Sequence, residues 1–401
     1  MIRLELLPAA CGDCLWLEYG EPSASRIVII DGGIQSTASV LRQRMSSALR
    51  ARNADTLDIE LLVVTHIDND HIKGITELLR EPDPRVNIKE IWFNGRTQLN
   101  GLPPLTKPAR VITARTRVSS LGWTESSDED DAQPSNAFPI PESEALLGPK
   151  QGDELSQLLE QRSIPWNRRT PDGSGIVMVA DDGALPTVAL DGGLKLTLLG
   201  PSLMRLHKLR ALWTAALLGD EDRTAAIDES AFLRRADVWP PCWQETEVPD
   251  SSVTNGSSIL LLAELDEHAL LLGGDAHADD IETAIARLQA ERNLARPFPL
   301  AAFKLPHHGS EKNVTRDLLE RIDCSRYLVS TDGSWHRHPD HQALLRILRF
   351  AKRPVQLLFN HAAATTTPWR DSKADVLESG IGDYEALYPN DKELGMILEL
   401  H

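Results

Sequence analysis

The chain has few cysteines, no long apolar run and a deficit of basic residues. Four cysteines in 401 residues are too few for the disulfide framework of a secreted protein. No apolar stretch approaches the roughly 18 residues of a membrane-spanning helix, and the N-terminus lacks the basic leader and apolar stretch of a signal peptide. We therefore predict a cytoplasmic protein without a membrane partner.

Cys11 and Cys14 form a C-x-x-C pair, a spacing found in zinc and redox sites. A zinc site of this kind needs a second pair, and the two other cysteines, Cys242 and Cys324, are scattered. A redox pair would lie where a strand passes into a helix, whereas the letters CLWLEYG indicate a continuing strand. We expect neither function for Cys11 and Cys14.

The net charge is −17, with 42 Lys and Arg against 59 Asp and Glu. This balance argues against broad electrostatic capture of nucleic acid, which depends on Lys and Arg contacts with phosphates. Two basic stretches, 107–118 and 204–210, could still form a local track. Their basic residues are Lys107, Arg110, Arg115, Arg117, Arg205, Lys208 and Arg210. Taken singly, each stretch is most simply a solvated face.

Strands and helices alternate along most of the chain, which is typical of a layered α/β protein. We predict a buried strand over 58–66, a helix that begins near His71, and paired strands over 257–265 and 268–276. Strands over 354–361 and 393–400 are expected at sheet edges. Because the chain exceeds the size that one core usually serves, we expect an N-terminal half, about 1–95, packed on a C-terminal half, about 190–401.

Residues 96–189 interrupt this pattern and are interpreted as an insertion. Within it, 124–144 is acidic and rich in Pro and Ser, with few large apolar residues. Such a segment cannot bury enough apolar surface to offset its ordering entropy, so we expect a mobile loop. Its acidic run, 128–131, could mimic nucleic acid over a basic groove until a regulatory partner or proteolysis displaces it. A merely solvated loop is the alternative.

Metal-ligand side chains gather at four predicted strand ends. The clusters are Asp31, the run from His66 to His71, Asp275, and the pair His307 and His308. The run is the most specific of them, because six residues hold His66, Asp68, Asp70 and His71. Leaving such groups uncompensated beside a buried strand would be costly. We therefore predict a metal site at this run.

The set D-G-G, T-H-x-[HD]-x-D-H-x-x-G, G-D and a late histidine resembles the metallo-β-lactamase fold. The stretches CGDCLWLEYG, LKLTLLGPS, NGSSILLLAEL, FKLPHHGS and WHRHP narrow the likeness to the hydrolase domain of the ComEC DNA-uptake protein and its soluble relatives. The resemblance covers 1–94 and 194–345. It implies one α/β domain over 1–401, an αββα sandwich of two mixed sheets with helices on the outer faces.

The resemblance also implies roles for individual residues. The implied metal ligands are His66, Asp68, Asp70, His71, Asp275, which would bridge two metals, and His308, which would close the second site. Asp70, His307 and His338 are the implied catalytic residues, with His338 near the substrate and His307 either a ligand or a proton donor. Asn255 and Ser257 would support the ligands or contact a phosphate, and Asp31 would support the ligand loop.

This sequence departs from the wider superfamily at the first metal, to which other members supply a further histidine. Between His71 and Asp275 the sequence holds only His207, in a helical stretch, and His268, in a hairpin turn. Both are expected at the surface, so the first metal would lack a third imidazole. Carboxylate-rich ligation favours harder cations, and we predict two divalent ions, Mn²⁺ ahead of Zn²⁺.

Two divalent cations can activate a water and stabilise the attacking and leaving oxygens of a phosphodiester. We expect the turns at 273–275 and 307–310 to present backbone N–H groups and an imidazole to the phosphoryl oxygens. The sequence therefore predicts a metal-dependent nuclease acting on DNA. The alternative is a phosphodiesterase for a small or lipid-linked phosphoester. An inactive binding module is disfavoured by the complete ligand set.

Overall fold

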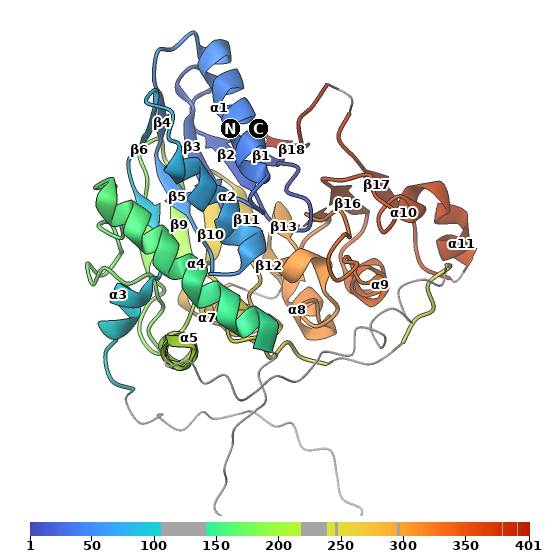
Figure 1. The fold of residues 1–401 in the computed structure, drawn as a ribbon. Coiled ribbons are helices and arrows are strands. Elements are labelled where there is room, and N and C mark those ends of the chain that lie inside the picture. The colour runs from blue at the N-terminus through green and yellow to red at the C-terminus, as the bar shows by residue number, and fades with distance from the viewer. Residues whose placement is uncertain (106–141, 218–238, 245–247, 295–296, 379, 391) are drawn as a thin grey trace, which may run out of the picture.

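Two β-sheets face each other in the computed structural model, which describes residues 1–105, 142–217, 239–244, 248–294, 297–378, 380–390 and 392–401, the side chains of 142–147 aside (Figure 1). The six-stranded sheet runs in the order β18 (Met396–Leu400), β1 (Ile2–Leu6), β2 (Leu15–Tyr19), β3 (Arg26–Ile30), β5 (Leu61–Val63) and β7 (Ile91–Trp92). Its first pairs are antiparallel, whereas β3, β5 and β7 run parallel.

The second sheet has eight strands. Their order is β17 (Tyr384–Leu387), β16 (Val355–Phe359), β15 (Arg326–Val329), β13 (Ala302–Lys304), β11 (His268–Leu272), β10 (Leu260–Leu265), β9 (Lys195–Gly200) and β8 (Thr187–Ala189). Strands β17 to β11 are parallel to their neighbours, and β11 to β8 are antiparallel. Two short pairs stand apart, β12 (Phe298–Pro299) with β14 (Ile322–Asp323) and β4 (Leu57–Ile59) with β6 (Val86–Ile88).

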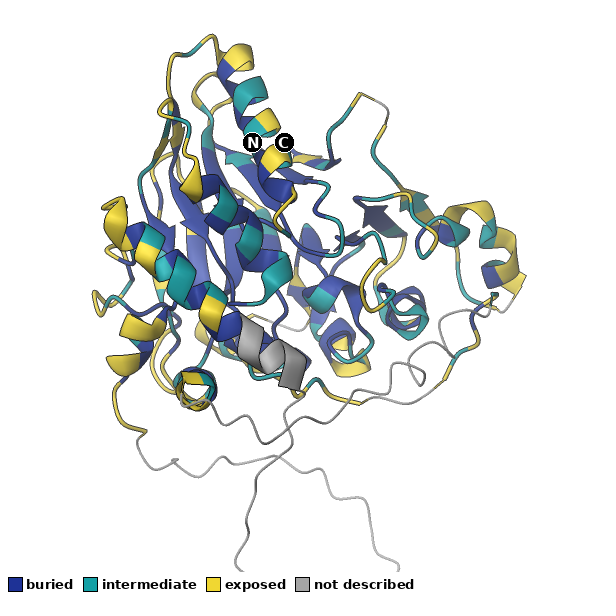
Figure 2. Ribbon diagram, in the orientation of Figure 1, coloured by how far each residue is buried: buried dark blue, intermediate teal, exposed yellow. Residues whose placement is uncertain are grey.

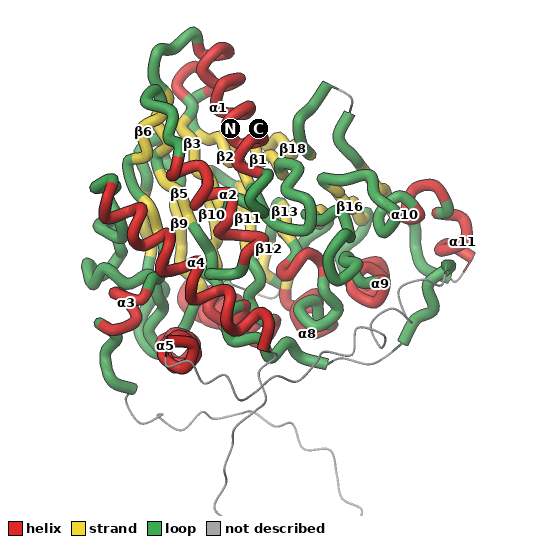
Figure 3. The backbone as a smooth tube through the Cα atoms, viewed as in Figure 1, coloured by secondary structure: helices red, strands yellow, loops and turns green. Residues whose placement is uncertain are grey.

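Helices cover the outer faces of the sheets, so strands lie between helices (Figure 3). The α-helices are α1 (Thr37–Arg52), α2 (Asn69–Arg80), α3 (Arg96–Asn100), α4 (Glu142–Gln161), α5 (Leu203–Leu217), α7 (Ala278–Glu291), α8 (Arg316–Arg321), α9 (His341–Phe350), α10 (Pro368–Asp371) and α11 (Lys373–Glu378). Short 3-10 turns are η1 (Pro22–Ala24), η2 (Asn255–Ser257) and η3 (Pro306–Gly309).

Strand β3 shows how the layers are held together. Val28 and Ile30 belong to the core between the two sheets, while Ile27 and Ile29 belong to a second core under the helices. That second core receives the buried residues of α1 and α2. Because successive strand residues point to opposite faces, a strand covered on both sides is apolar throughout. Figure 2 shows the sheets dark with burial and the covering helices striped.

Two features of the sheets differ from the sequence prediction. The single strand expected over 58–66 is two strands, because β4 pairs with β6 whereas β5 enters the sheet between β3 and β7. The switch falls at Glu60, a buried carboxylate paired with Arg26 and Lys89. The strand expected at an edge over 354–361 is internal, since β17 lies outside it. The edge position of β18 is confirmed.

The first turn of α2 is clamped between two glycine-containing loops. Gly74 N donates to Gly33 O at 2.9 Å, and a Cβ on Gly74 would lie 1.8 Å from Gly32 O. On the other side, a Cβ on Gly12 would lie 1.8 Å from Asp70 O. Only glycine permits either approach, so the start of α2 is fixed where its side chains face the opposite sheet.

Helix α4, from the segment interpreted as an insertion, lies across α2 (Figure 1). A Cβ on Gly148 would lie 3.0 Å from Ile67 Cδ1 and 3.5 Å from Asp68 Oδ1. This segment therefore covers the loop that leads from β5 to α2. The expected acidic loop over 124–144 falls almost wholly outside the described residues. Among the helices that are described, none is both long and apolar enough to cross a membrane.

Candidate metal centre

The predicted ligands come from three strand ends at one edge of the sandwich. His66 and Asp68 lie in the loop after β5, and Asp70 and His71 lie in the first turn of α2. Asp275 follows β11, and His308 lies in η3, directly after β13. Because parallel strands place their carboxyl ends at the same edge, these loops meet there. The structure thus brings all six predicted ligands into one cluster.

Their ligand atoms approach each other in pairs. His71 Nε2 lies 3.3 Å from Asp275 Oδ1, and His308 Nε2 lies 3.2 Å from Asp70 Oδ2. His66 Nε2 lies 3.4 Å from Asp68 Oδ2. Asp275 Oδ2 is also 3.9 Å from His66 Nε2 and 3.7 Å from His308 Nε2. Asp275 therefore lies between the three imidazoles, the place predicted for a bridging carboxylate.

The buried atoms of the cluster lack hydrogen-bond partners. The Nε2 atoms of His66, His71 and His308 and the Oδ1 atom of Asp275 are buried, and none has such a partner among the described residues. Buried polar atoms are ordinarily paired, so unpaired nitrogens and a carboxylate oxygen that converge fit the first shell of a cation. Two overlapping groups could each hold an ion, His66 with His71 and Asp275, and Asp70 with His71 and His308.

The opposite ring nitrogen of each imidazole is already occupied. His71 Nδ1 lies 2.9 Å from Asp31 Oδ2, and His308 Nδ1 lies 2.9 Å from the carbonyl oxygen of Ser330. His66 Nδ1 lies 3.0 Å from the hydroxyl of Thr65. Partners of this kind orient a metal-binding imidazole and set its tautomer. Each ring therefore directs Nε2 into the cluster.

Asp31 lies beneath the ligand loop, where the sequence placed it. Its carboxylate accepts from the backbone N–H and the hydroxyl of Thr65, each at 2.7 Å, in addition to binding His71. The residue has a φ of 59°, a left-handed conformation that costs energy for any residue but glycine. The three contacts hold Asp31 in this conformation.

In the absence of metal, the opposite charges within the cluster shift the pKa values of its side chains. Burial opposes the charged form of His308, but the carboxylates of Asp275 and Asp13 outweigh it and raise its pKa to about 10. The pKa of His71 also rises well above its ordinary value, because Asp275, Asp70 and Asp31 outweigh its burial. The neighbouring imidazoles hold the pKa of Asp275 well below its ordinary value against the effect of burial. Cations bound here would take over the role of the imidazolium protons.

His307 is held away from the cluster. Its Nδ1 lies 3.1 Å from Asn313 Oδ1, 3.3 Å from Asp250 Oδ2 and 3.3 Å from Asn255 Nδ2. Within the part of the chain that is described, His307 belongs to none of the His and Asp groups able to hold an ion. The role of proton donor, the other one that the sequence left open, stays a prediction. The ring centre of His338 lies 5.1 Å from that of His307.

Strain accompanies the pair of histidines in η3. His307 and His308 have φ values of 48° and 55°, both in the left-handed region. Two such residues in succession occur where surrounding contacts impose them, commonly at functional sites. The turn places the two imidazoles in different surroundings, one in the cluster and one beside it.

The expectation for the turns at 273–275 and 307–310 is wrong for three of their amides and stays a prediction for the others. Three of their amides are used inside the protein: Asp275 N donates to Ser258 Oγ, His307 N to Gly274 O and Ser310 N to His307 O. These N–H groups are not offered to a substrate.

In the described part of the chain, Asn255 and Ser257 make no hydrogen bond to the six clustered ligands, although Asn255 Nδ2 lies 3.3 Å from His307 Nδ1. Asn255 Nδ2 donates to Asp250 Oδ2 at 2.8 Å, and Ser257 Oγ donates to Thr254 O at 2.6 Å. The contacts to ligands come from their neighbours. Thr254 Oγ1 donates to Asp68 Oδ2 at 2.8 Å, and Ser258 Oγ lies 3.3 Å from His66 Nδ1.

Sequence reasoning missed Asp13, Lys304 and Asp250. Asp13 and Lys304 form a buried ion pair, and Asp13 Oδ1 lies 3.4 Å from His308 Nδ1. A lysine inside an apolar strand was the one available signal, because a buried ammonium requires a carboxylate partner. Asp250 lies in an irregular segment, and no sequence signal indicated its role.

His207 and His268 lie outside the cluster, as expected. His207 Nε2 is 2.8 Å from Pro103 O, and His268 Nε2 is 2.9 Å from His401 O. Neither histidine supplies a further imidazole to the first metal. Of the basic stretches, 107–117 lies outside the described residues, and Arg205 in the other is paired with Asp279 and Asp280.

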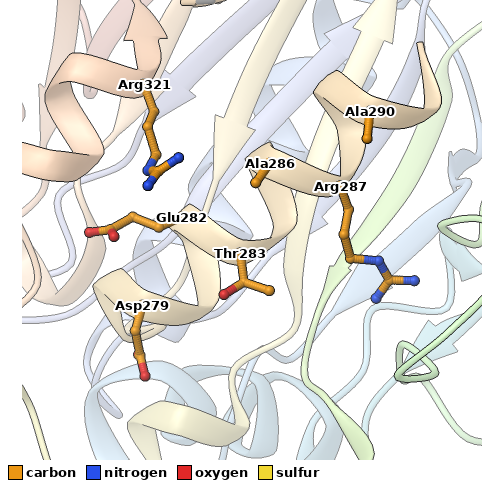
Figure 4. A pocket seen from close by; sticks show the side chains of 7 residues that line it. All are labelled: Asp279, Glu282, Thr283, Ala286, Arg287, Ala290 and Arg321. Atoms are coloured by element: carbon orange, nitrogen blue, oxygen red, sulfur yellow. The ribbon is translucent and has the colours of Figure 1, made fainter. Parts of the chain in front are cut away.

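A hollow of about 490 Å³ lies on the outer side of α7 (Figure 4). Its lining residues are Asp279, Glu282, Thr283, Ala286, Arg287, Ala290 and Arg321. None of them belongs to the cluster around Asp275. Glu282 is engaged by Thr315, and Arg287 donates to two backbone carbonyls, so the hollow offers no convergent chemistry.

A family model matches part of the chain. The model of the Metallo-beta-lactamase superfamily matches residues 14–98, the part that contains Asp31 and the run from His66 to His71. Among solved structures, a mutant of the CmlA beta-hydroxylase is 12% identical with a TM-score of 0.36, over all of this chain and 54% of that chain. This chain thus spans about half the length of that protein. No curated protein matches it.

Two mixed sheets lie between helices, and buried His and Asp side chains from the strand ends form a site consistent with two metal ions. These are features of a metal-dependent enzyme. The chain has the metallo-β-lactamase fold, as the sequence predicted.

Proposed function

We propose that this protein is a metal-dependent hydrolase of phosphodiester bonds, in the first place a nuclease acting on DNA. The observation that carries the proposal is the convergence of three unpartnered imidazole nitrogens on three carboxylates, Asp68, Asp70 and Asp275. The sequence motifs that contain these side chains also support the resemblance to the ComEC hydrolase domain and its soluble relatives.

The residues at hand suit two ions. His66, His71 and Asp275 would hold one, and Asp70, His71 and His308 the other. Asp68 lies 3.4 Å from His66 Nε2 and would complete the first, and Asp275 would be shared. Two divalent cations would supply an activated water and neutralise charge on the phosphoryl oxygens. Because carboxylates equal imidazoles in number, the donor set is harder than one rich in imidazole, which favours Mn²⁺ and leaves Zn²⁺ second.

The proton for the leaving oxygen would come from His307. Asp250 and Asn313 occupy its Nδ1, so Nε2 is the ring atom left to transfer a proton. His338 packs edge-on against the same ring, and its own Nδ1 lies 3.3 Å from Asp340 Oδ1. His338 would hold His307 in place and contact the substrate from the same side.

A second candidate is a phosphodiesterase for a small or lipid-linked phosphoester. The net charge of −17 favours it, as does the pairing of Arg205 with Asp279 and Asp280, which reduces the basic surface open to a polyanion. The two candidates share the metal chemistry and differ in the surface around it.

The experiment compares metal-stripped protein, Asp70→Ala and the control His268→Ala on plasmid DNA, single-stranded RNA and bis-p-nitrophenyl phosphate, with Mn²⁺, Mg²⁺ or Zn²⁺ restored in turn. We expect the wild type and the control to cleave DNA with Mn²⁺, and Asp70→Ala to lose at least 100-fold in rate. Turnover of bis-p-nitrophenyl phosphate without cleavage of nucleic acid would contradict the nuclease and support the second candidate. No turnover of any ester would refute both.

Regulation by the acidic run 128–131, which lies outside the described residues, is part of the same proposal. Deleting 125–136 should raise the rate on DNA without changing the rate on bis-p-nitrophenyl phosphate, because only a polyanion would compete with the acidic run. An unchanged rate on DNA would leave the run a solvated loop.

A further inference from the structure

Trp335 is held in solvent close to the metal cluster. It exposes 59% of its surface. Among the exposed large apolar residues in the described part of the chain, Trp335 is the aromatic one. Trp side chains are normally covered because they bury a large area. An exposed one on a folded loop therefore indicates a contact that the isolated chain does not make.

The loop that carries Trp335 has a defined shape. It connects β15 to α9, and its base is tied by Asp332 N donating to Ala10 O at 2.9 Å. Asp332 Oδ1 also accepts from Ser334 N at 2.8 Å and Ser334 Oγ at 2.5 Å. The next residues, His336 and Arg337, have φ values of 52° and 56°. Such strain persists where a structure imposes it, so Trp335 is displayed rather than loosely frayed.

A series of ring contacts joins Trp335 to the catalytic region. Ring centres are 5.5 Å apart for Trp335 and His336, 5.9 Å for His336 and His338, and 5.1 Å for His338 and His307. His307 is followed directly by the predicted ligand His308. A substrate with its phosphate at the cluster can therefore extend along this loop to the indole.

The loop has mixed charge around the indole, because Arg337 is basic while Asp332 and Asp340 border the stretch between them. The stretch GSWHRHP, 333–339, holds two histidines and an arginine around the indole and no carboxylate, in a chain whose net charge is −17. Basic groups interleaved with an aromatic ring are the pattern by which proteins bind single-stranded nucleic acid. Burial lowers the pKa of His338, so Arg337 is the residue of this stretch that carries a fixed positive charge.

We propose that Trp335 determines specificity by stacking on an unpaired nucleobase of a single-stranded nucleic acid, with His336 and Arg337 beside the adjacent phosphate. The proposal rests on the proposed phosphodiesterase function and adds a substrate class to it. Stacking needs a base that is not already paired, so single strands and frayed ends should bind better than duplex interiors.

The first test measures binding alone, with metal-free full-length protein and a fluorescein-labelled dT8 strand, by fluorescence anisotropy. The matched strand has the same phosphates but abasic sites in place of thymines. Because stacking contributes about 1–3 kcal/mol per base, Trp335→Ala should weaken dT8 binding about tenfold and abolish the preference of the wild type for dT8 over the abasic strand. Trp335→Phe should retain most of that preference, and Leu387→Ala, an exposed apolar control on β17, should retain all of it.

The second test measures cleavage of dT8 with Mn²⁺. Trp335→Ala should raise KM about tenfold with kcat changed little, since the indole lies outside the reacting groups. Equal binding of both strands by wild type and Trp335→Ala would overturn the specificity role even if DNA is cleaved. Failure of the wild type to cleave any ester would refute the proposed function, while the anisotropy result would still decide the role of Trp335. Self-association lost in Trp335→Ala, with dT8 binding unchanged, would assign the indole to a contact between copies instead.

Discussion

Asp31 and His71 are joined by a hydrogen bond of 2.9 Å between Oδ2 and Nδ1, although they lie 40 residues apart in the chain. Both side chains are fully buried. The contact exists because β3 and β5 are parallel neighbours whose carboxyl ends meet. It places a proton on Nδ1 of His71 and leaves Nε2 for the cluster at Asp275.

Replacing Asp31 by Asn should therefore weaken metal binding without removing a ligand. The amide retains the size of the carboxylate but loses the charge that orients His71, and partners of this kind change metal affinity by about 10–100-fold. Mn²⁺ titration by calorimetry measures the change. Asp181→Asn, at an exposed position, is the control and should bind as the wild type does. An unaltered affinity in Asp31→Asn would show that the contact does not tune the site.

The number of ions bound should depend on which ligand is removed. We expect two equivalents of Mn²⁺ in the wild type, about one in His308→Ala and less than one in Asp275→Ala, because only Asp275 reaches all three imidazoles. Elemental analysis after gel filtration gives these ratios. His268→Ala, whose imidazole binds the backbone of His401, should keep both ions. A full complement in Asp275→Ala would disprove a bridging role.

The cluster could be predicted from the sequence because its information is local. Four ligand-type residues within six positions, after an apolar stretch, identify a strand end and its loop. Asp275 and His308 follow the same logic, since each ends a strand of the same kind. The rule that parallel strands end at one edge then brings the loops together.

What could not be predicted depends on contacts between distant segments. Asp13 and Lys304 are 291 positions apart, so a lysine inside an apolar strand indicates that a carboxylate partner exists but not which one it is. The break at Glu60 depends on whether β4 pairs with β6 or continues beside β3, a choice made by the sheet. The position of His307 is set by Asn313 and Asp250 from separate loops, so the sequence alone could not distinguish ligand from proton donor.

Removing metal should make stability and metal affinity depend on pH in opposite ways. In the metal-free chain the pKa of His308 is about 10, because Asp275 and Asp13 outweigh its burial. A raised pKa means that the stabilisation is complete below pH 6.5 and is lost as the pH rises through about 10. Metal binding needs the neutral ring, so the apparent Mn²⁺ affinity should rise over the same window.

Urea unfolding of EDTA-treated protein between pH 6.5 and 9.5, beside Mn²⁺ titrations from pH 6.5 to 9, measures both trends. His308→Gln, which cannot titrate, should show a smaller loss of stability across that range. A free energy of unfolding that rises with pH in the metal-free wild type would contradict the assignment of an imidazolium to the cluster.

Replacing one partner of the ion pair of Asp13 and Lys304 should lower the free energy of unfolding strongly. Replacing both partners should lower it much less. Both side chains are fully buried, and Lys304 together with His308 lowers the pKa of Asp13 to about 2 although burial alone would raise it. Lys304→Met leaves a buried carboxylate without its cation, which should reduce the free energy of unfolding by about 3–5 kcal/mol. In the double variant Asp13→Asn, Lys304→Met, no charge is left uncompensated, and most of that loss should return.

Urea unfolding of metal-free Asp13→Asn, Lys304→Met and the double variant gives the double-mutant cycle. The control is Lys352→Met, which breaks the exposed pair with Asp323 and should cost less than about 1 kcal/mol. Losses that simply add in the double variant would mean that Asp13 and Lys304 act independently. A restored double variant that still binds fewer ions than the wild type would then isolate the second contribution of Asp13, the contact of 3.4 Å through which it orients His308.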